Sequence, residues 1–214
     1  MKASVIVPAY NEGKRIAALL SRMPRGYEVV VVDDGSADNT AEEAQRCRAK
    51  VVRLPKNMGK ANACLEGMRH STHEYCVFID GDGQHRPEDI PRIISALQSA
   101  DIVIGSRNMK TVPLHRRLAN WYASKAASFA TGRHFPDVLS GFRGVRKSPF
   151  SNLTFKKSGY FFESEMAIEA AKHGLSVSSV PVNVTYEYGA RMGVVKGLEI
   201  AAWLFAKCVE KLFA

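Results

Sequence analysis

The sequence predicts an α/β fold, with a mostly parallel sheet flanked by helices. Short apolar stretches rich in Val and Ile recur along the first half of the chain, and stretches with helical spacing separate them. A group of polar residues follows most of the apolar stretches. Strands that are apolar along their whole length are typical of parallel sheets with helices on both faces.

The individual elements follow from the spacing of the apolar residues. Strands are expected at residues 3–7, 27–32, 50–54, 75–79 and 101–104. Helices are expected at residues 12–23, from the candidate N-caps Ser36 and Asp38 to residue 48, at residues 60–70 and at residues 87–98. After residue 107 the pattern changes, with helices expected at residues 114–131, 163–173 and 196–213 and a strand at 177–185. No linker or repeat interrupts the chain, so we predict a single domain, residues 1–214.

Composition excludes several classes of protein. The chain has 214 residues, of which 46% are hydrophobic and 24% charged, which is ordinary for a globular protein and unlike a disordered or repeat protein. The four cysteines form no C-x-x-C pair, so we expect neither a zinc site nor a disulfide framework, and a reducing, cytoplasmic compartment fits best. The first apolar run is too short for a signal peptide, and no run reaches the roughly 18 residues of a membrane span.

The net charge of +9 comes from the middle of the chain. Residues 105–160 contain 11 Lys and Arg residues and a single acid, Asp137, whereas residues 1–104 contain 14 basic and 14 acidic residues. Such a local excess indicates an anionic partner, which could be phosphate groups, an acidic membrane surface or nucleic acid. A plain solvated surface is the structural alternative.

Four polar clusters should lie at one edge of the sheet. They are "PAYNE" after the first strand, "DDGSADNT" after the second, "DGDGQH" after the fourth and "GSR" after the fifth. The carboxyl ends of parallel strands meet at one edge, and ligands bind outside that edge. We therefore expect the four clusters to form one site.

The cluster after the fourth strand has the composition of a metal site. Asp80 and Asp82 flank one glycine, and Gln84 adds a neutral oxygen. Mg²⁺ and Mn²⁺ prefer such oxygen ligands and usually keep positions for phosphate oxygens. A capped surface turn with two acids is the structural alternative.

Two other segments could contact a nucleotide. Asp33 or Asp34 could accept a hydrogen bond from a base or a ribose hydroxyl, or both could only cap the next helix. Lys56 and Lys60 lie around Gly59 at a helix start, where a phosphate is favourable. No G-x-G-x-x-G follows the first strand, which disfavours a dinucleotide-binding fold, and no Walker A motif is present.

Together these segments resemble the family-2 glycosyltransferases, which have the GT-A fold, a Rossmann-like sheet. The matching segments are "SVIVPAYNE", "VVVVDDGSADNT", "KNMGKANA", "FIDGDGQHRPED", "GSR", "DVLSGFRGVRK" and "FFESEMAIEAAKHG". The subgroup that the chain resembles most is the dolichyl-phosphate mannose synthase-like polyprenyl-phosphate glycosyltransferases, whose D-x-D-x-Q-H-x-P-E pattern is met from Asp80 to Glu88. The resemblance covers roughly residues 3–186.

The resemblance implies a nucleotide-sugar donor, such as GDP-mannose or a UDP-sugar. The residues implied to bind the donor are Pro8, Tyr10, Glu12, Asp34 and Lys60. Asp82 and Gln84 would bind a divalent metal, Mg²⁺ or Mn²⁺, that bridges the diphosphate, with Asp80 near the ribose or the metal. On this reading residues 1–107 form the nucleotide-sugar-binding half, residues 108–193 the acceptor-side half and residues 194–214 a C-terminal amphipathic helix.

The subgroup further implies a polyprenyl-phosphate acceptor, such as dolichyl or undecaprenyl phosphate. Arg107 and Arg116 would bind its phosphate, with Asn120 one helical turn on, where family members often have Ser. A phosphate acceptor would need no general base, whereas a hydroxyl acceptor would need one, for which Asp137 and Glu165 are candidates. Both acids could instead be structural partners of nearby arginines.

The end of the chain departs from the family pattern. An R-x-x-G-x-S-K-like stretch often follows the last strand, and here Arg191, Gly193 and Lys196 stand in a different register, with Val195 in place of Ser. Donor contacts by Arg191 or Lys196 are therefore open. The last helix has a wide apolar arc, which would suit a membrane interface with Trp203, a dimer interface or core packing.

The sequence therefore predicts an inverting, metal-dependent glycosyltransferase that acts on a polyprenyl phosphate, in the cytoplasm or on the cytoplasmic face of a membrane, with a homodimer as a further option. Transfer to a sugar or protein hydroxyl is the main alternative. A sugar nucleotidyltransferase would show a G-G-x-G-x-R loop, which is absent after the first strand. A basic nucleic-acid-binding module would leave the polar clusters unexplained, so we expect no nucleic-acid partner.

Overall fold

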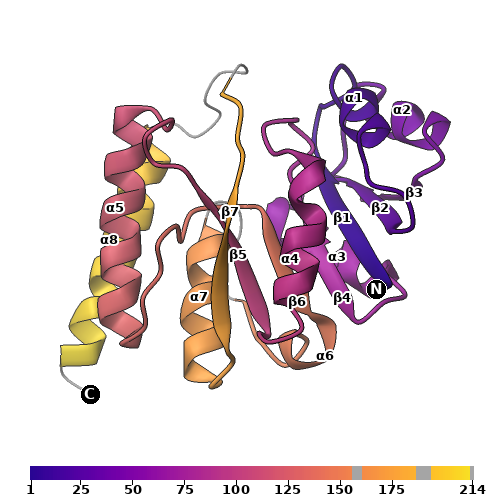
Figure 1. The fold of residues 1–214 in the computed structure, drawn as a ribbon. Coiled ribbons are helices and arrows are strands. Elements are labelled where there is room, and N and C mark those ends of the chain that lie inside the picture. The colour runs from indigo at the N-terminus through magenta and orange to yellow at the C-terminus, as the bar shows by residue number, and fades with distance from the viewer. Residues whose placement is uncertain (156–160, 187–193, 213–214) are drawn as a thin grey trace.

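The computed structural model describes residues 1–155, 161–186 and 194–212, and within these it forms one seven-stranded sheet with helices on both faces (Figure 1). The strands are β1 (Ala3–Ala9), β2 (Glu28–Asp33), β3 (Lys50–Arg53), β4 (Tyr75–Phe78), β5 (Ile102–Arg107), β6 (Arg143–Arg146) and β7 (Val177–Val182). Their order is β3-β2-β1-β4-β6-β5-β7, and β6 runs antiparallel to both neighbours. The predicted α/β class with a mostly parallel sheet is confirmed.

The helices also follow the apolar spacing. They are α1 (Ile16–Ser21), α2 (Thr40–Arg46), α3 (Lys60–His70), the 3₁₀ helix η1 (Pro87–Asp89), α4 (Ile90–Ala96), α5 (Leu114–Thr131), α6 (Lys147–Phe150), α7 (Phe162–Lys172) and α8 (Val194–Leu212). The first helix is shorter than expected, and in the segment before it the Gly13 N–H donates to the Asp38 carboxylate at 3.0 Å. Among the described residues, none of these helices combines the length and apolarity needed to cross a membrane.

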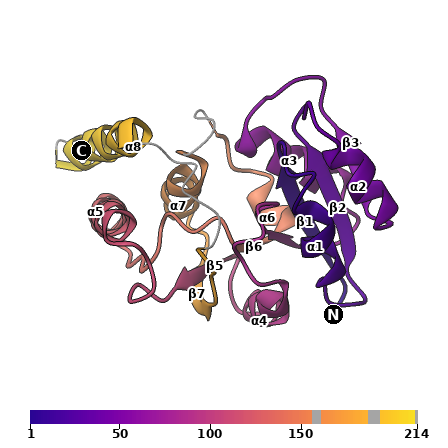
Figure 2. The same cartoon turned by 90° about the horizontal axis from the view of Figure 1, so that it is seen from above.

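Two apolar cores hold the helices against the sheet. Residues of β1 alternate between them, so that Val5 and Val7 pack with α1 and α4, whereas Ile6 packs with α3 and α7. Seen from above, the two helix layers lie on opposite sides of the sheet (Figure 2). The fully apolar strands thus bury both faces, as their sequence requires.

A third core joins α5, α7 and α8 at one end of the sheet. Ile200 and Leu204 of α8 are buried in the same cluster as Ala123 and Ala127 of α5. Figure 2 shows α5 and α8 side by side, with α7 next to them. Trp203 packs edge-on against Phe161, with ring centroids 5.8 Å apart. Core packing therefore accounts for this part of the wide apolar arc of α8.

Two strands differ from the sequence-based expectation. The segment "GSR" was expected to follow the fifth strand, but it belongs to β5, which pairs with β7 as far as Arg107. The antiparallel strand β6 has no periodic apolar pattern of its own, since its residues are "RGVR". It forms because β4 and β5 offer backbone groups on both sides, a long-range effect that a four-residue pattern does not report.

The register of the sheet brings the predicted polar clusters to one edge. Ala9 of β1 pairs with Asp33 of β2, and β4 ends on the other side of β1. β1 continues through Pro8, which was expected to end it. The Pro8 carbonyl still accepts a hydrogen bond from Gly81 N at 3.2 Å, so this part of the β4 loop is held against β1.

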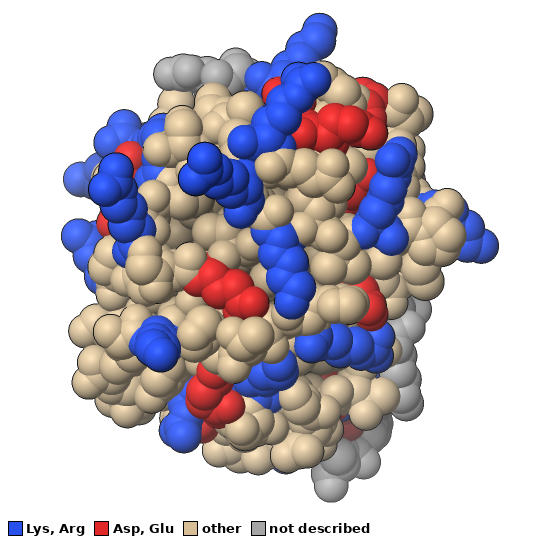
Figure 3. Space-filling view, turned by 90° about the vertical axis from the view of Figure 1, so that its right-hand side faces the viewer, with Lys and Arg blue, Asp and Glu red and all other residues tan. Residues whose placement is uncertain are grey.

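Polar side chains also lie on the surface over α1, α2 and β3. Figure 3 shows this flank, where basic and acidic side chains are interspersed.

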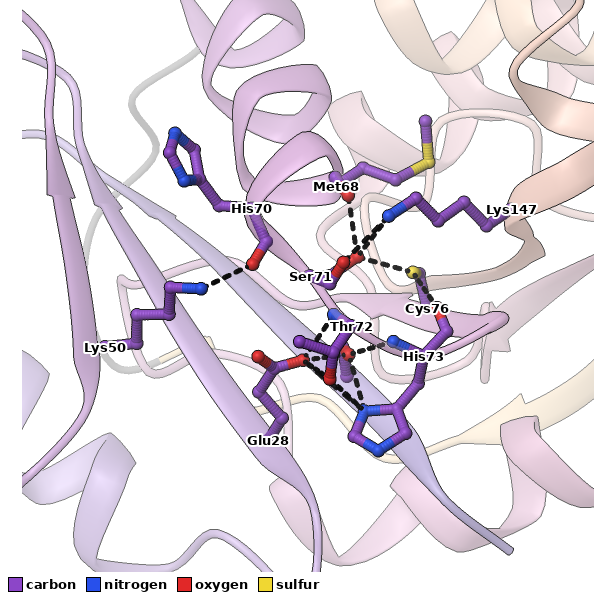
Figure 4. A network of polar contacts seen from close by, with 10 residues as sticks. Glu28, Lys50, Met68, His70, Ser71, Thr72, His73, Cys76 and Lys147 are labelled. Carbon is purple, nitrogen blue, oxygen red and sulfur yellow. Dashed lines mark hydrogen bonds and ion pairs between the residues drawn. The ribbon is translucent and has the colours of Figure 1, made fainter.

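A polar group lies at the amino ends of the strands, at the edge of the sheet away from the predicted clusters. Glu28 accepts hydrogen bonds from Ser4 Oγ at 2.5 Å and Thr72 N at 2.8 Å (Figure 4). Ser4 Oγ and Glu28 both approach the same ring nitrogen of His73, Nδ1, so this group ties β1, β2 and the segment before β4 together without the geometry of a catalytic triad.

Candidate active site

A cavity of about 410 Å³ opens where β1, β2 and β4 end. Seven predicted site residues line it, namely Pro8, Tyr10, Glu12, Asp34, Lys60, Asp80 and Asp82. They come from the end of β1, from the loops after β1, β2 and β4, and from the start of α3. The structure therefore brings the clusters of the first, second and fourth strands together, as the parallel register requires.

A second cavity of about 150 Å³ adjoins the first. Its walls include Gln84, His85, Arg107, Arg116, Leu139, Gly141 and Glu163. Lys60, Asp80 and Asp82 line both cavities. The acidic pair thus stands at the boundary between a larger cavity at the β1 and β2 loops and a smaller one with two arginines.

The turn after β4 holds the acidic pair in place. A Cβ at Gly81 would lie only 3.1 Å from Ala9 Cβ, so the turn passes close to β1. Asp82 Oδ1 accepts a hydrogen bond from Gln84 N at 3.0 Å. Burial and the neighbouring Asp80 charge raise the pKa of Asp82 to about 6. Burial raises the pKa of Asp80, but the charge and hydrogen bond of Lys60, together with smaller contributions from neighbouring groups, hold that pKa below its usual value.

Lys60 forms an ion cluster with two acids from different parts of the chain. Its Nζ lies 2.6 Å from Asp80 Oδ1 and 2.7 Å from Glu163 Oε1. These two carboxylates raise the pKa of Lys60 despite its burial, so it stays charged. Gly141 leaves room for this cluster, because a Cβ there would lie 2.4 Å from Lys60 Nζ. Lys60 was expected to meet a phosphate, and in the structure its ammonium is shared by two carboxylates.

A buried arginine positions the segment around Gly141. Arg143 is almost fully buried, and its guanidinium donates to the carbonyls of Ser140 and Glu163, each at 2.8 Å, and to the carbonyl of Val138. Burial lowers its pKa to about 10, which still leaves it charged at neutral pH. Arg143 therefore ties the loop before β6 to the start of α7, where Glu163 meets Lys60.

The two acids after β2 make different contacts. Asp33 is fully buried, and its Oδ1 accepts from Ser36 N at 3.0 Å, so it stabilises the turn. Asp34 lines the larger cavity, and its two oxygens accept from Met58 N at 2.7 Å and Gly59 N at 2.9 Å. Burial raises the pKa of Asp34 and outweighs these two hydrogen bonds.

The two predicted arginines both reach the smaller cavity, but in different ways. Arg107 is paired with Asp137, which is fully buried and lines neither cavity. Arg116 Nη1 lies 3.5 Å from Gln84 Oε1, and its guanidinium lies 5.3 Å from the ring centroid of Tyr186. Arg116 is therefore the less tightly paired cation beside the acidic turn.

Other predicted residues lie elsewhere. Asn120 is buried, and its side chain bonds to Leu139 N and Pro136 O, so it supports the loop after α5 and does not line the smaller cavity. Glu165 is buried in α7 and lines neither cavity. Arg191 and the side chain of Lys196 lie outside the residues that the structure describes.

Three site residues had no role in the sequence-based prediction: Glu163, Gly141 and His85. The signal was present, because all three belong to segments that carry the family resemblance. His85 is buried against Phe142, with ring centroids 5.2 Å apart, and burial lowers its pKa to about 4. It is therefore neutral at pH 7 and adds no charge to the site.

The donor set of the turn fits a hard divalent cation. Two carboxylates and the Gln84 amide offer oxygen atoms, and a cation would relieve the repulsion between the carboxylates, which adds to burial in raising the pKa of Asp82. Among the described residues no group of three or more His, Cys, Asp and Glu could hold a metal. A cation here would therefore take further ligands from a bound substrate or water, as Mg²⁺ usually does.

Comparison with known proteins agrees with this architecture. The model of glycosyl transferase family 2 matches residues 4–154. The chain is 34% identical over 208 residues to a dolichol-phosphate mannosyltransferase from Pyrococcus furiosus. The matched region covers 89% of this chain and 57% of that protein. It is 29% identical over 201 residues to an undecaprenyl-phosphate mannosyltransferase from Micrococcus luteus, which covers 85% of this chain and 83% of that protein.

The fold is also found in solved structures. Glucosyl-3-phosphoglycerate synthase from Mycobacterium tuberculosis, crystallised with Mn²⁺, UDP-glucose and phosphoglyceric acid, superposes with a TM-score of 0.77 at 21% identity. The match covers 98% of this chain and 79% of that one. The sheet order, the polar loops at its carboxyl edge and the family match lead to one conclusion: the chain belongs to glycosyltransferase family 2 and has the GT-A fold.

Proposed function

We propose that this glycosyltransferase moves a sugar from a nucleotide-sugar, such as GDP-mannose or a UDP-sugar, to a polyprenyl phosphate, with Mg²⁺ or Mn²⁺ and with inversion at the sugar. One observation carries the proposal. Asp80 and Asp82 stand between a larger cavity, next to the loops of β1 and β2, and a smaller cavity with Arg107 and Arg116. A donor and an anionic acceptor would meet at this boundary.

The larger cavity suits the nucleotide end of a donor. Asp34 and Glu12 offer carboxylate oxygens for hydroxyl or base N–H groups, and Tyr10 is an exposed aromatic ring at the opening. The diphosphate would lie toward Asp80 and Asp82, where a divalent cation would stabilise the charge of the departing nucleoside diphosphate. A fold relative has been crystallised with Mn²⁺ and a UDP-sugar, which supports this assignment.

The smaller cavity suits a phosphate acceptor. Arg107 is held by Asp137, and Arg116 adds a second guanidinium beside Gln84. A phosphate monoester, with a second pKa of about 6, is largely dianionic at neutral pH. Its oxygen could attack the sugar carbon as the bond to the diphosphate breaks, so the arginines need only position it. Relatives named for dolichol phosphate and undecaprenyl phosphate support this acceptor class.

The acceptor class also bears on where the protein works. A polyprenyl phosphate is a membrane lipid, so we propose peripheral contact with the cytoplasmic face of a membrane. We keep the division into a donor half, residues 1–107, and an acceptor half, residues 108–193, because Arg107 and Arg116 stand at that boundary. For the alternative of a hydroxyl acceptor the candidate bases are Asp137 and Glu165, and neither lines the larger or the smaller cavity.

Radiolabelled sugar transfer tests the donor and metal assignments. The purified chain is incubated with labelled GDP-mannose or UDP-sugars and a polyprenyl phosphate, with Mg²⁺, Mn²⁺ or EDTA. Transfer should require the cation and fall at least about 100-fold in Asp82→Asn, the scale of losing one charge-stabilising group. Glu42→Gln, an exposed acid away from both cavities, is the control and should retain activity. Full activity of Asp82→Asn would refute the metal role.

A second comparison tests the acceptor. The polyprenyl phosphate and the matching polyprenol, which lacks the phosphate, are offered in parallel. Only the phosphate should accept sugar, and Arg116→Ala should raise its KM about 10-fold or more, in line with the loss of a charge-assisted contact. Transfer to the polyprenol at an equal rate would favour the hydroxyl-acceptor alternative.

A further inference from the structure

Helix α5 exposes a stripe of large apolar side chains. Leu114, Leu118 and Trp121 are 60%, 57% and 61% exposed. Their spacing of four and three residues puts them on one face of the helix. Single exposed apolar residues are common, but a stripe of three on neighbouring turns, one of them Trp, indicates an interaction surface.

The other side of α5 is already occupied. Ala123 and Ala127 are buried in the core with Ile200 and Leu204 of α8, and Cys208 Sγ of α8 contacts the Ala126 carbonyl at 3.4 Å. Helix α8 therefore packs behind α5 and leaves the stripe uncovered within the described residues. Of the three options for α8, namely a membrane interface, a dimer interface and core packing, its buried residues Ile200 and Leu204 show core packing against α5.

A cavity of about 560 Å³ lies beside the stripe, between α5 and the segments that precede and follow it. Its apolar wall consists of Met109, Leu118, Trp121, Phe135 and Pro136. Two cationic residues, Arg117 and Lys125, also line it, and both are exposed. An apolar hollow with a cationic rim matches an amphiphile that has an anionic head.

The charged side chains of α5 have one sign. Helix α5 contains Arg116, Arg117 and Lys125 and no acid. The one acid of residues 105–160, Asp137, is fully buried and paired with Arg107, so it does not offset these charges at the surface. The flank over α1, α2 and β3 in Figure 3 differs, since acids there accompany the bases.

We propose that the α5 face, made of Leu114, Arg117, Leu118, Trp121 and Lys125, binds the surface of an anionic lipid bilayer. The apolar stripe would enter the interface, where Trp is favoured, and the cations would lie among the lipid phosphates. This inference deepens the proposed function, because it names the surface that brings the enzyme to a lipid acceptor.

The position of the α5 face relative to the site is consistent with that role. Arg116 belongs to the same first turns of α5 but points into the smaller cavity, toward Gln84. One short stretch of helix thus presents a cation to the site and apolar groups to the outside. A lipid phosphate held at Arg116 would have to extend its chain only past the start of α5 to reach the bilayer.

Vesicle sedimentation with the full chain tests the proposal without any substrate. Vesicles of phosphatidylcholine with about one third phosphatidylglycerol are compared with pure phosphatidylcholine, at low and high salt. We expect binding to the anionic vesicles that weakens with salt, because surface charges are screened. Leu118→Ser with Trp121→Ser should lower the partition coefficient at least about 10-fold, and Lys125→Glu should lower it on anionic vesicles only. Equal binding to both vesicle types, or none, would overturn the proposal.

A matched control is available on α8. Phe205 is 62% exposed, so Phe205→Ser removes an equally exposed apolar group outside the α5 face. It should leave vesicle binding unchanged, and binding lost in Phe205→Ser but kept in the α5 variant would assign the membrane contact to α8. Circular dichroism melts confirm that each variant is folded. Sedimentation velocity tests for a second copy, and a dimer that the α5 variant dissociates, without vesicle binding, would refute the lipid partner.

Different experimental outcomes would refute the membrane face of α5 and the proposed function. Each variant is also assayed with a short-chain, water-soluble prenyl phosphate as acceptor. Normal transfer to this acceptor, with reduced transfer to long-chain acceptor in vesicles, supports both. Vesicle binding with the expected variant pattern but no transfer to either acceptor supports the membrane face and refutes the proposed acceptor. Transfer in vesicles that the α5 variant does not reduce refutes the membrane face alone.

Discussion

Arg107 binds both carboxylate oxygens of Asp137. Nη2 lies 2.7 Å from Oδ1, while Nε and the backbone N of Arg107 lie 2.8 and 2.9 Å from Oδ2. Asp137 is fully buried, and Arg107 reaches from this pair to the smaller cavity. Burial lowers the pKa of Arg107, whereas the Asp137 carboxylate raises it. The carboxylate prevails, so the guanidinium stays charged.

Replacing Asp137 with Asn should therefore act through Arg107. Removing one partner of a buried ion pair costs about 3–5 kcal/mol, so urea denaturation should show a loss of this order. Asp101→Asn, in a partly exposed pair with Arg146 at 3.6 Å, is the control and should cost about 1 kcal/mol or less. The pH profile of kcat should keep its shape. A folded variant with normal acceptor KM but a changed pH profile would make Asp137 a base instead.

Asp82→Asn should make the protein more stable at pH 7. The pKa of Asp82 is raised to about 6 from 3.8, so its charged form is disfavoured in the folded state. That penalty is fully present above pH 6 and disappears as the pH falls toward 4. The variant should gain on the order of 1 kcal/mol in free energy of unfolding at pH 7, allowing for solvent screening, and the gain should shrink at pH 4. Urea denaturation at both pH values measures this, and a loss of stability at pH 7 would contradict it.

Gly141→Ala should disturb the Lys60 cluster. The new Cβ would lie 2.4 Å from Lys60 Nζ and 2.6 Å from Asp80 Oδ2, so at least one of them must move. We expect a loss of about 1–3 kcal/mol, the usual range for overpacking, together with reduced transfer. A double-mutant cycle with Lys60→Ala identifies the cause, because coupling above about 0.5 kcal/mol is expected only if the two residues interact. Additive effects would rule out the clash with Lys60.

Glu28→Gln should destabilise the protein in a pH-dependent manner. Burial would raise the pKa of Glu28, but the hydrogen bonds from Ser4 and Thr72 outweigh it and lower that pKa below 4.5. The charged form is therefore favoured in the folded state, and its contribution is present above pH 4.5 and lost as the pH falls through the folded pKa. We expect a loss of about 1–2 kcal/mol at pH 7 that fades toward pH 3. A pH-independent loss would contradict this, and the exposed Glu42→Gln serves as control.

Much of the fold follows from local patterns. The apolar strands and the helices α3 and α5 appear where the spacing places them, and the parallel register alone brings Asp34 and Asp80 to one edge. β6 does not follow, because "RGVR" has no periodicity and depends on the backbone groups of β4 and β5.

The candidate site shows the same division. The acidic turn and the two arginines could be named from the sequence, because each is marked by its place after a strand or within a family motif. Glu163 could not be assigned to Lys60, since 103 positions separate them and their 2.7 Å contact depends on how Arg143 anchors the start of α7. The role of Asp137 as the partner of Arg107 was one of two options until their side chains were placed.

The sequence by itself determined the α/β class, the edge of the sheet where the polar loops meet and the membership of a family, because periodicity and short motifs are local properties. Only the tertiary structure decided which charges pair and which helix face stays open. Lys60 is paired with Asp80 and Glu163, and the buried residues of α8 pack on α5. These choices depend on distances between remote side chains and on burial, which exist only after the chain has folded.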